Sequence, residues 1–319
     1  MESVIENRLG TSREARRIAF LLKCLTRPVL RYSPLTPPML RLAGVFDWGA
    51  SVVMRPSRHT RIERVRLDGF HGEWIRTEGI TNPGRVILYL HGDGFFSCGL
   101  RTHRNLVAGL AARSDAVAFS VAYRQLPGAP LSTSMADALA SYRWLLDQGY
   151  GADDIVIAGD SAGGFLAFTT VLSALEAGLP VPAGIVTLSP LADLDHVARK
   201  PYPHTRKDAY IPAHRLKGLK RLLLAGMDED PSPSTRDLTG LPPVFIMVGS
   251  REALRFDAEL MAARLAEAGV PHRLQIWEDQ VHVFPVFAGV VPEGAQALDE
   301  IAAFVYEVTP TPRPTARAA

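Results

Sequence analysis

The sequence predicts an α/β fold with one mostly parallel sheet and helices on both of its faces. Two observations support this prediction. Short continuous apolar runs recur along the chain, as expected for strands buried on both faces, and helical patterns separate several of these runs. The runs are Val86–Leu90, Ala116–Ala122, Ile155–Ala158, Gly184–Leu188, Val244–Val248 and Leu274–Trp277.

The chain before these strands has a different pattern. Residues 1–50 hold Arg, Leu and Phe in irregular helical spacing and become proline-rich around Pro37. They predict one or two helices that pack on another part of the protein. From Ile62, alternating apolar residues on both sides of a turn at Gly69 and Gly72 predict an antiparallel hairpin.

Helices are predicted between and after the later strands. Apolar residues share one helical face in 139–146, 261–268 and, at i, i+3, i+4 and i+7, in 298–305. Residues 194–238 interrupt the alternation of strand and helix, and their Lys, Arg, His and Pro content predicts a helical insertion. The core is therefore expected in 51–193 and 239–308, and the Pro-, Thr- and Arg-rich residues 309–319 are expected to be disordered.

Composition excludes several classes of protein. The 319 residues are 47% hydrophobic and 21% charged, which indicates a packed globule. A net charge of +2 gives no overall field that would attract nucleic acid. No Cys/His cluster has zinc-ligand spacing, so no metal site is expected, and two cysteines are too few for a disulfide framework. With no signal-peptide pattern and no membrane-length apolar stretch, we expect a cytoplasmic protein without stable membrane insertion.

The strongest local signal is Gly159-Asp-Ser-Ala-Gly-Gly164, which follows one predicted strand and precedes the helical run 165–175. A Gly-x-Ser-x-Gly segment between a strand and a helix is typical of a nucleophile elbow, in which small neighbours allow a strained serine backbone. The amides at the start of the helix then face developing negative charge. We predict Ser161 as the nucleophile.

A second glycine-rich segment, His91-Gly-Asp-Gly-Phe95, directly follows the strand that ends at Leu90. A loop here can place backbone N–H groups opposite the nucleophile. We predict an oxyanion hole formed by the amides of Gly92, Asp93 and Ala162. A carboxylate facing the oxyanion would oppose its charge, so the side chain of Asp93 is expected to turn away from the pocket or to narrow the substrate range.

A nucleophilic serine needs a base, and the base needs an acid that orients it. Glu252 follows the strand that ends at Val248, and His282 follows the strand that ends at Trp277, so both are expected at the carboxyl edge of the sheet. We predict Glu252 as the acid and His282 as the base. Three rivals remain: Asp257, expected to be a solvated charge within the next helix; Asp279, in the same loop as His282; and His272, on the wrong edge of the sheet.

Together these motifs resemble the hormone-sensitive-lipase-like family of α/β-hydrolases, in its bacterial esterase branch. The resemblance covers roughly residues 86–305 and includes Tyr123-Arg-Gln-Leu-Pro127, Ser189-Pro-Leu-Ala-Asp193 and Leu241-Pro-Pro243 besides the motifs above. It implies an eight-stranded α/β-hydrolase core under a helical cap formed by residues 1–50 and 194–238. The family's acid is usually Asp and its oxyanion loop usually has glycine at the position of Asp93, so Glu252 and Asp93 depart from the pattern.

The function implied is hydrolysis of short- to medium-chain carboxylic esters through an acyl-enzyme, without a cofactor. The partner is then a small ester or lipid substrate, and a homodimer is left open. Three alternatives also remain open. The same triad could serve an acyltransferase or amidase, or the pocket could belong to a non-catalytic small-ligand-binding protein. The apolar N-terminal helix could also bind a lipid surface, which the balanced charge expected of that segment and its expected role in the cap disfavour.

Overall fold

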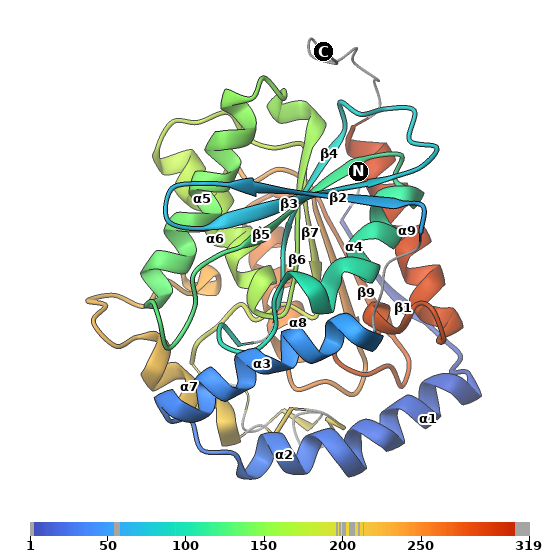
Figure 1. Ribbon diagram of the computed structural model, residues 1–319, viewed down its shortest axis with the longest axis vertical. Coiled ribbons are helices and arrows are strands. Elements are labelled where there is room, and N and C mark those ends of the chain that lie inside the picture. Colours follow the sequence, from blue (N-terminus) through green and yellow to red (C-terminus); the bar gives the residue numbers. More distant parts are fainter. Residues whose placement is uncertain are drawn as a thin grey trace.

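The computed structural model describes residues 3–53, 58–92, 94–195, 197, 199, 202–203, 208–209, 211–212 and 214–309, without the side chains of residues 44, 46 and 48–53. A twisted nine-stranded sheet crosses the molecule (Figure 1) in the order β1-β9-β8-β7-β6-β4-β5-β3-β2. β2 and β3 are antiparallel to their neighbours, and the other pairings are parallel. The strands are β1 (Val4–Arg8), β2 (Thr60–Arg66), β3 (His71–Thr77), β4 (Val86–Leu90), β5 (Val117–Ala122), β6 (Ile155–Asp160), β7 (Gly184–Leu188), β8 (Val244–Gly249) and β9 (His272–Trp277).

Helices cover both faces of the sheet, as the sequence predicts. The α-helices of the described residues are α1 (Arg13–Leu21), α2 (Arg27–Tyr32), α3 (Pro37–Val53), α4 (Leu100–Arg113), α5 (Leu131–Asp147), α6 (Ala162–Glu176), α7 (His214–Leu223), α8 (Arg255–Glu267) and α9 (Pro292–Val308). α5, α6 and α8 contribute to one hydrophobic cluster, and α4 and α9 contribute to a second cluster on the opposite face. Figure 1 shows these groups on opposite sides of the sheet.

The central strands explain why their sequences read as continuous apolar runs. In β4, Val86, Leu88 and Leu90 belong to the first cluster, whereas Ile87 and Tyr89 belong to the second, and all five are fully buried. A strand covered by helices on both faces has no side that can carry exposed polar residues. The fold class predicted from the sequence is therefore confirmed.

The N-terminal segment differs from the helical cap segment that the sequence predicts. Val4–Arg8 forms β1, a ninth strand that pairs in parallel with β9, with Val4 opposite Arg273 and Arg8 opposite Trp277. Only after this strand does the chain continue into α1, a π-helical turn at Leu22–Thr26, α2 and α3. Because β1 is parallel to β9, α1 begins at the carboxyl edge of the parallel strands.

The cap insertion and the tail are described only in part. α7 provides the helix expected within residues 194–238, and several neighbouring residues of the insertion lie outside the described residues. Thr309, expected to open a disordered tail, is buried against Arg85, which donates to Thr309 Oγ1 at 2.7 Å and to its carbonyl oxygen at 2.9 Å. The rest of the predicted tail, residues 310–319, lies outside the described residues. Within the described part of the chain, no helix is long and apolar enough to cross a membrane.

Candidate active site

Ser161 lies at the turn between β6 and α6 and has a backbone conformation that L-residues rarely adopt, with φ +50° and ψ −115°. Such conformations cost about 1–3 kcal/mol and cluster at functional sites. The turn needs its glycines. A Cβ at residue 163 would lie 1.9 Å from the carbonyl oxygen of Leu90, and one at residue 159 would lie 2.3 Å from that of Gly163. The conformation predicted for a nucleophile elbow is present at Ser161.

Glu252 and His282 meet beyond the ends of two adjacent strands. Glu252 follows β8, His282 follows β9, and Gly249 pairs with Trp277 at the ends of these strands. His282 Nδ1 lies 2.8 Å from Glu252 Oε2, and only 5% of His282 and none of Glu252 is exposed. The acid and base predicted from the sequence, thirty residues apart in the chain, are therefore brought into direct contact.

The other carboxylate oxygen of Glu252 is held by two donors. Glu252 Oε1 accepts a hydrogen bond from Ser189 Oγ at 2.7 Å and another from the Gly249 amide. Ser189 Oγ accepts in turn from the Val283 amide at 3.0 Å. Ser189 thus fixes both the acid and the residue next to the base. The sequence reasoning assigned no role to Ser189, although its Ser-Pro motif was a signal that the residue following β7 matters.

Burial lowers the pKa of His282, but its hydrogen bond to Glu252 and the negative charge of that carboxylate outweigh this effect. The charges of Asp208 and Asp160 also raise this pKa, and the net shift is upward from 6.5. Because Glu252 can only accept, His282 carries its proton on Nδ1, which leaves Nε2 as the basic atom of the neutral ring. Asp160, which raises the pKa of His282 through its charge, is the residue directly before Ser161, so His282 lies within electrostatic range of the elbow.

The three rivals are occupied elsewhere. Asp257 is not the solvated charge expected from the sequence, because it is fully buried, pairs with Arg199 and accepts from the amides of residues 192 and 193. Asp279 pairs with Arg251 on the surface. His272 opens β9 at the opposite edge of the sheet, where its Nδ1 lies 3.2 Å from Ser3 Oγ. Glu252 and His282 therefore remain the best-placed pair.

The oxyanion donors predicted from the sequence need one correction. The Gly92 amide donates to Asp160 Oδ1 at 3.0 Å in the buried interior, so it is already engaged and does not point freely toward a substrate. Asp93 lies outside the described residues. Ala162 is the first residue of α6, and a helix leaves its first amides without partners inside the helix. Gly94, the next described residue of the loop, has φ +69°.

Asp160 is a buried carboxylate beneath this loop that the sequence reasoning did not single out. It is 2% exposed and accepts from Tyr89 Oη at 2.7 Å, from the Gly92 amide, and from His103 Nε2 at 3.3 Å. Burial raises the pKa of Asp160, but the charge and hydrogen bond of His103 and the hydrogen bond of Tyr89 outweigh it, so the net shift is downward. An ionised Asp160 therefore joins the elbow to the loop after β4. The position of Asp160 directly before Ser161 could have indicated its role from the sequence, whereas no local sequence pattern pointed to His103.

His91, at the start of the same loop, is not a second base. Its ring is stacked on Tyr123 with centroids 4.5 Å apart, and Tyr123 Oη donates to its carbonyl oxygen at 2.8 Å. Burial, together with the charge of His103, lowers the pKa of His91 to about 4. The ring is neutral near pH 7 and serves to pack the loop.

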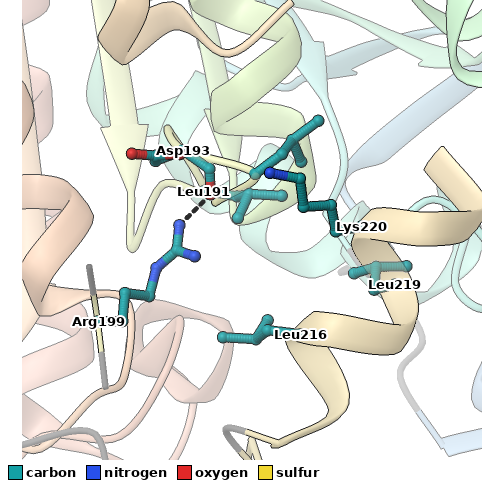
Figure 2. Close-up of a pocket in the computed structure, with 7 residues that line it drawn as sticks. Leu191, Asp193, Arg199, Leu216, Leu219 and Lys220 are labelled. Atoms are coloured by element: carbon teal, nitrogen blue, oxygen red, sulfur yellow. Dashed lines mark hydrogen bonds between the residues drawn. The ribbon is translucent and has the colours of Figure 1, made fainter. Parts of the chain in front are cut away.

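α7 packs closely on the segment that follows β7. Figure 2 shows the small hollow there, whose volume of about 10 Å³ holds roughly one water molecule. Arg199 reaches across it to the carbonyl oxygen of Asp193 and also pairs with Asp257 on α8. This buried ion pair fastens the insertion to the core. The hollow is lined by Leu191, Asp193, Leu194, Arg199, Leu216, Leu219 and Lys220.

The described residues contain no group of three or more His, Cys, Asp and Glu side chains placed to hold a metal ion. The site consists of a strained serine, a buried acid–base pair and a helix N-terminus. These are the kinds of group that acyl transfer uses, in which a base deprotonates a serine hydroxyl and amides stabilise an oxyanion.

Comparison with known proteins relates this chain to esterases. A family model described as the alpha/beta hydrolase fold matches residues 87–286. The esterase LipU of Mycobacterium tuberculosis is 35% identical over 295 residues, which cover 89% of this chain and 99% of LipU. The carboxylesterase/phospholipase LipF of the same organism is 32% identical over 94% of this chain and 83% of LipF. A crystal structure of an esterase from the bacterial hormone-sensitive lipase family has a TM-score of 0.85 and 31% identity, covering 94% of this chain and 100% of that one.

Proposed function

This chain belongs to the α/β-hydrolase family, in its hormone-sensitive-lipase-like branch, and we propose that it hydrolyses short- to medium-chain carboxylic esters through an acyl-enzyme on Ser161. The fold and the family resemblance stated from the sequence are confirmed. The observation that carries the proposed mechanism is the buried contact between His282 and Glu252, in a molecule whose Ser161 has the strained conformation of an elbow.

In the first step His282 Nε2 accepts the hydroxyl proton of Ser161 while Ser161 Oγ forms a bond to the ester carbonyl carbon. Glu252 holds the ring and stabilises the imidazolium that forms. The carbonyl oxygen becomes an oxyanion, for which we propose the Ala162 amide and the loop amides that follow Gly92 as donors. The C–O bond to the alcohol then breaks, and the alcohol leaves with the proton from His282.

In the second step water replaces the alcohol. His282 accepts a proton from water as the water oxygen bonds to the acyl carbon, and it returns that proton to Ser161 Oγ when the acyl-enzyme bond breaks. The products are a carboxylic acid, an alcohol and free enzyme. Neither step needs a metal or an oxidant.

The direct test is hydrolysis of p-nitrophenyl esters from acetate to palmitate by the wild type and Ser161→Ala. We expect wild-type turnover to be greatest with short or medium acyl chains and to fall at least about 1000-fold in the variant, because residues of a triad act as a unit. The variant should also lose the burst of p-nitrophenol. Circular dichroism and thermal melting show whether it remains folded. A folded Ser161→Ala protein with wild-type turnover would refute the mechanism.

For its partners we propose a small ester or lipid substrate, supported by the esterase relatives. We also propose a cytoplasmic location, supported by the fact that Cys24 and Cys98 are not joined by a disulfide. Size-exclusion chromatography with light scattering distinguishes a monomer from the homodimer that the sequence leaves open.

A further inference from the structure

The helical stretch formed by α1, the π-helical turn and α2, residues 13–32, has an inner and an outer face. On the inner face Ala15 is buried, and Ile18, Ala19 and Leu22 pack against the core cluster that contains α4 and α9. The outer face exposes large apolar side chains instead of covering them. These are Phe20 (66% exposed), Leu21 (48%), Leu25 (66%), Val29 (62%) and Tyr32 (76%).

The same stretch carries a strong excess of positive charge. It contains six of the 35 basic side chains of the protein but only one of the 33 acidic side chains, Glu14. Within the described part of the chain, none of the six has an ion-pair partner, whereas some exposed arginines elsewhere do, such as Arg113 with Asp299 and Arg236 with Glu176. The basic side chains are Arg13, Arg16, Arg17, Lys23, Arg27 and Arg31.

Basic and apolar side chains are interleaved rather than separated. Arg16, Arg17, Phe20 and Leu21 line one shallow hollow on α1. Large exposed apolar side chains indicate an interaction surface, and unpaired cations among them favour a partner that is negatively charged at its surface and apolar just below it. An anionic bilayer has that structure, because its headgroups carry the charge and its acyl chains lie beneath them.

The position of this stretch relates it to the catalytic edge of the sheet. The segment leading into α1 is tied to the loop that carries His282, because the Gly10 amide donates to Glu278 Oε2 at 2.8 Å and Thr11 Oγ1 donates to the Glu278 carbonyl oxygen at 3.1 Å. Ser12, which caps α1, also donates to Glu293 Oε2 at 2.8 Å. Figure 1 shows α1 and α2 at the same end of the molecule as α3 and α7. A surface bound there would lie against the cap side of the enzyme.

We propose that the outer face of residues 13–32 binds reversibly to the surface of anionic lipid bilayers. The apolar side chains enter the boundary between headgroups and acyl chains, and the basic side chains contact the headgroups. The stretch lies on the membrane without crossing it, and the cap then faces the bilayer. The balanced charge expected of this segment was wrong for residues 13–32, where basic side chains outnumber acidic ones six to one. That excess and the exposed outer face favour the lipid-surface role that the sequence analysis disfavours.

The test is co-sedimentation of the full chain with vesicles of phosphatidylcholine, alone or with about 30% phosphatidylglycerol as the anionic lipid. We expect binding to the anionic vesicles and release when NaCl is raised from about 0.05 M to about 0.5 M. Since each basic side chain near such a surface strengthens binding about fivefold, Arg16→Gln/Arg17→Gln/Lys23→Gln should weaken it about 100-fold. Phe20→Ser/Leu25→Ser should weaken it by about tenfold for each side chain removed.

Matched controls remove the same kinds of side chain elsewhere. Arg61→Gln/Arg64→Gln/Arg66→Gln neutralises three exposed arginines on β2, and Val290→Ser removes a 61% exposed apolar side chain. Both should bind within about twofold of the wild type, because they lie outside the proposed surface. Hydrolysis of a dissolved ester should be unchanged in all four variants, and because sedimentation needs no catalysis, it tests this proposal independently of the esterase mechanism.

Three results would overturn the proposal. One is failure of the wild type to sediment with anionic vesicles. Another is equal weakening in the α1 variants and the β2 control, which would indicate only an effect of net charge. The third is a wild-type dimer that becomes monomeric in Phe20→Ser/Leu25→Ser without any vesicle binding, which would make the outer face an interface between two copies of the chain.

Discussion

Replacing Glu252 by Gln tests the central contact of the site with a minimal change in shape. The carboxylate makes three hydrogen bonds, accepting from Ser189 and Gly249 through Oε1 and from His282 through Oε2. In the variant the amide oxygen can still accept the first two. The NH₂ group then faces His282 Nδ1, where two donors would meet.

The clash can be relieved if His282 moves its proton to Nε2, which leaves Nδ1 to accept from the new amide. That tautomer cannot take a proton from Ser161. A change of this kind in a serine triad lowers kcat by about 10⁴, and we expect a loss of about 10³–10⁴, equivalent to roughly 4–5.5 kcal/mol at 1.36 kcal/mol per factor of ten. Folding should persist because the side chain keeps its size and two of its bonds.

The assay is steady-state hydrolysis of p-nitrophenyl butyrate, with thermal melting to verify the fold. Glu267→Gln makes the same chemical change on the surface at the end of α8, where Glu267 is paired with Arg264, and it should leave kcat unchanged. Asp279→Asn, which removes the rival acid in the His282 loop, should retain most of the activity. The reasoning is refuted if Glu252→Gln keeps more than about a tenth of the wild-type kcat, or if Asp279→Asn loses as much as Glu252→Gln does.

Three further outcomes follow from the same geometry. Glu252 raises the pKa of His282 above 6.5, and the base must be neutral, so kcat/KM should fall as the pH drops through a value above 6.5. The residual activity of Glu252→Gln should fall only at a lower pH, and pH–rate profiles of both proteins measure the difference. Asp160→Asn should lower kcat about 10- to 100-fold with little change in KM, because the loop after β4 loses its charged anchor but substrate contacts remain; an unchanged kcat contradicts that role. Glu252→Asp should lower kcat at least about tenfold, since a carboxylate about 1.5 Å shorter cannot keep all three bonds; wild-type kinetics would show that side-chain length does not matter there.

The parts of this protein that could be predicted from sequence are those encoded locally. The buried strands appear as apolar runs because both faces of the sheet are covered. Ser161 could be placed because its strained turn requires small residues on each side, and Glu252 and His282 because each follows a strand of a parallel sheet. These three assignments needed only the glycine-rich motif around Ser161 and the order of the strands along the chain.

The features that were missed depend on partners far away in the sequence. Val4–Arg8 alternates too weakly to be identified as a strand and becomes one by pairing with β9, about 270 residues later. The Gly92 amide was expected to face the oxyanion, but the side chain of Asp160, 68 residues away, binds it. Asp257 was expected to be solvated, and Arg199 from the cap insertion buries it. None of these partners can be inferred from the residues beside them.

The proposed acid, Glu252, lies where the ends of three strands converge. Glu252 lies three residues beyond the end of β8, in a turn that brings its carboxylate back to the amide of Gly249 on its own strand. From there Oε1 reaches Ser189 after β7 and Oε2 reaches His282 after β9. One carboxylate thus joins the ends of three neighbouring strands. Because Ser189 also accepts from the amide beside His282, the acid positions its base through the backbone as well as through the ring.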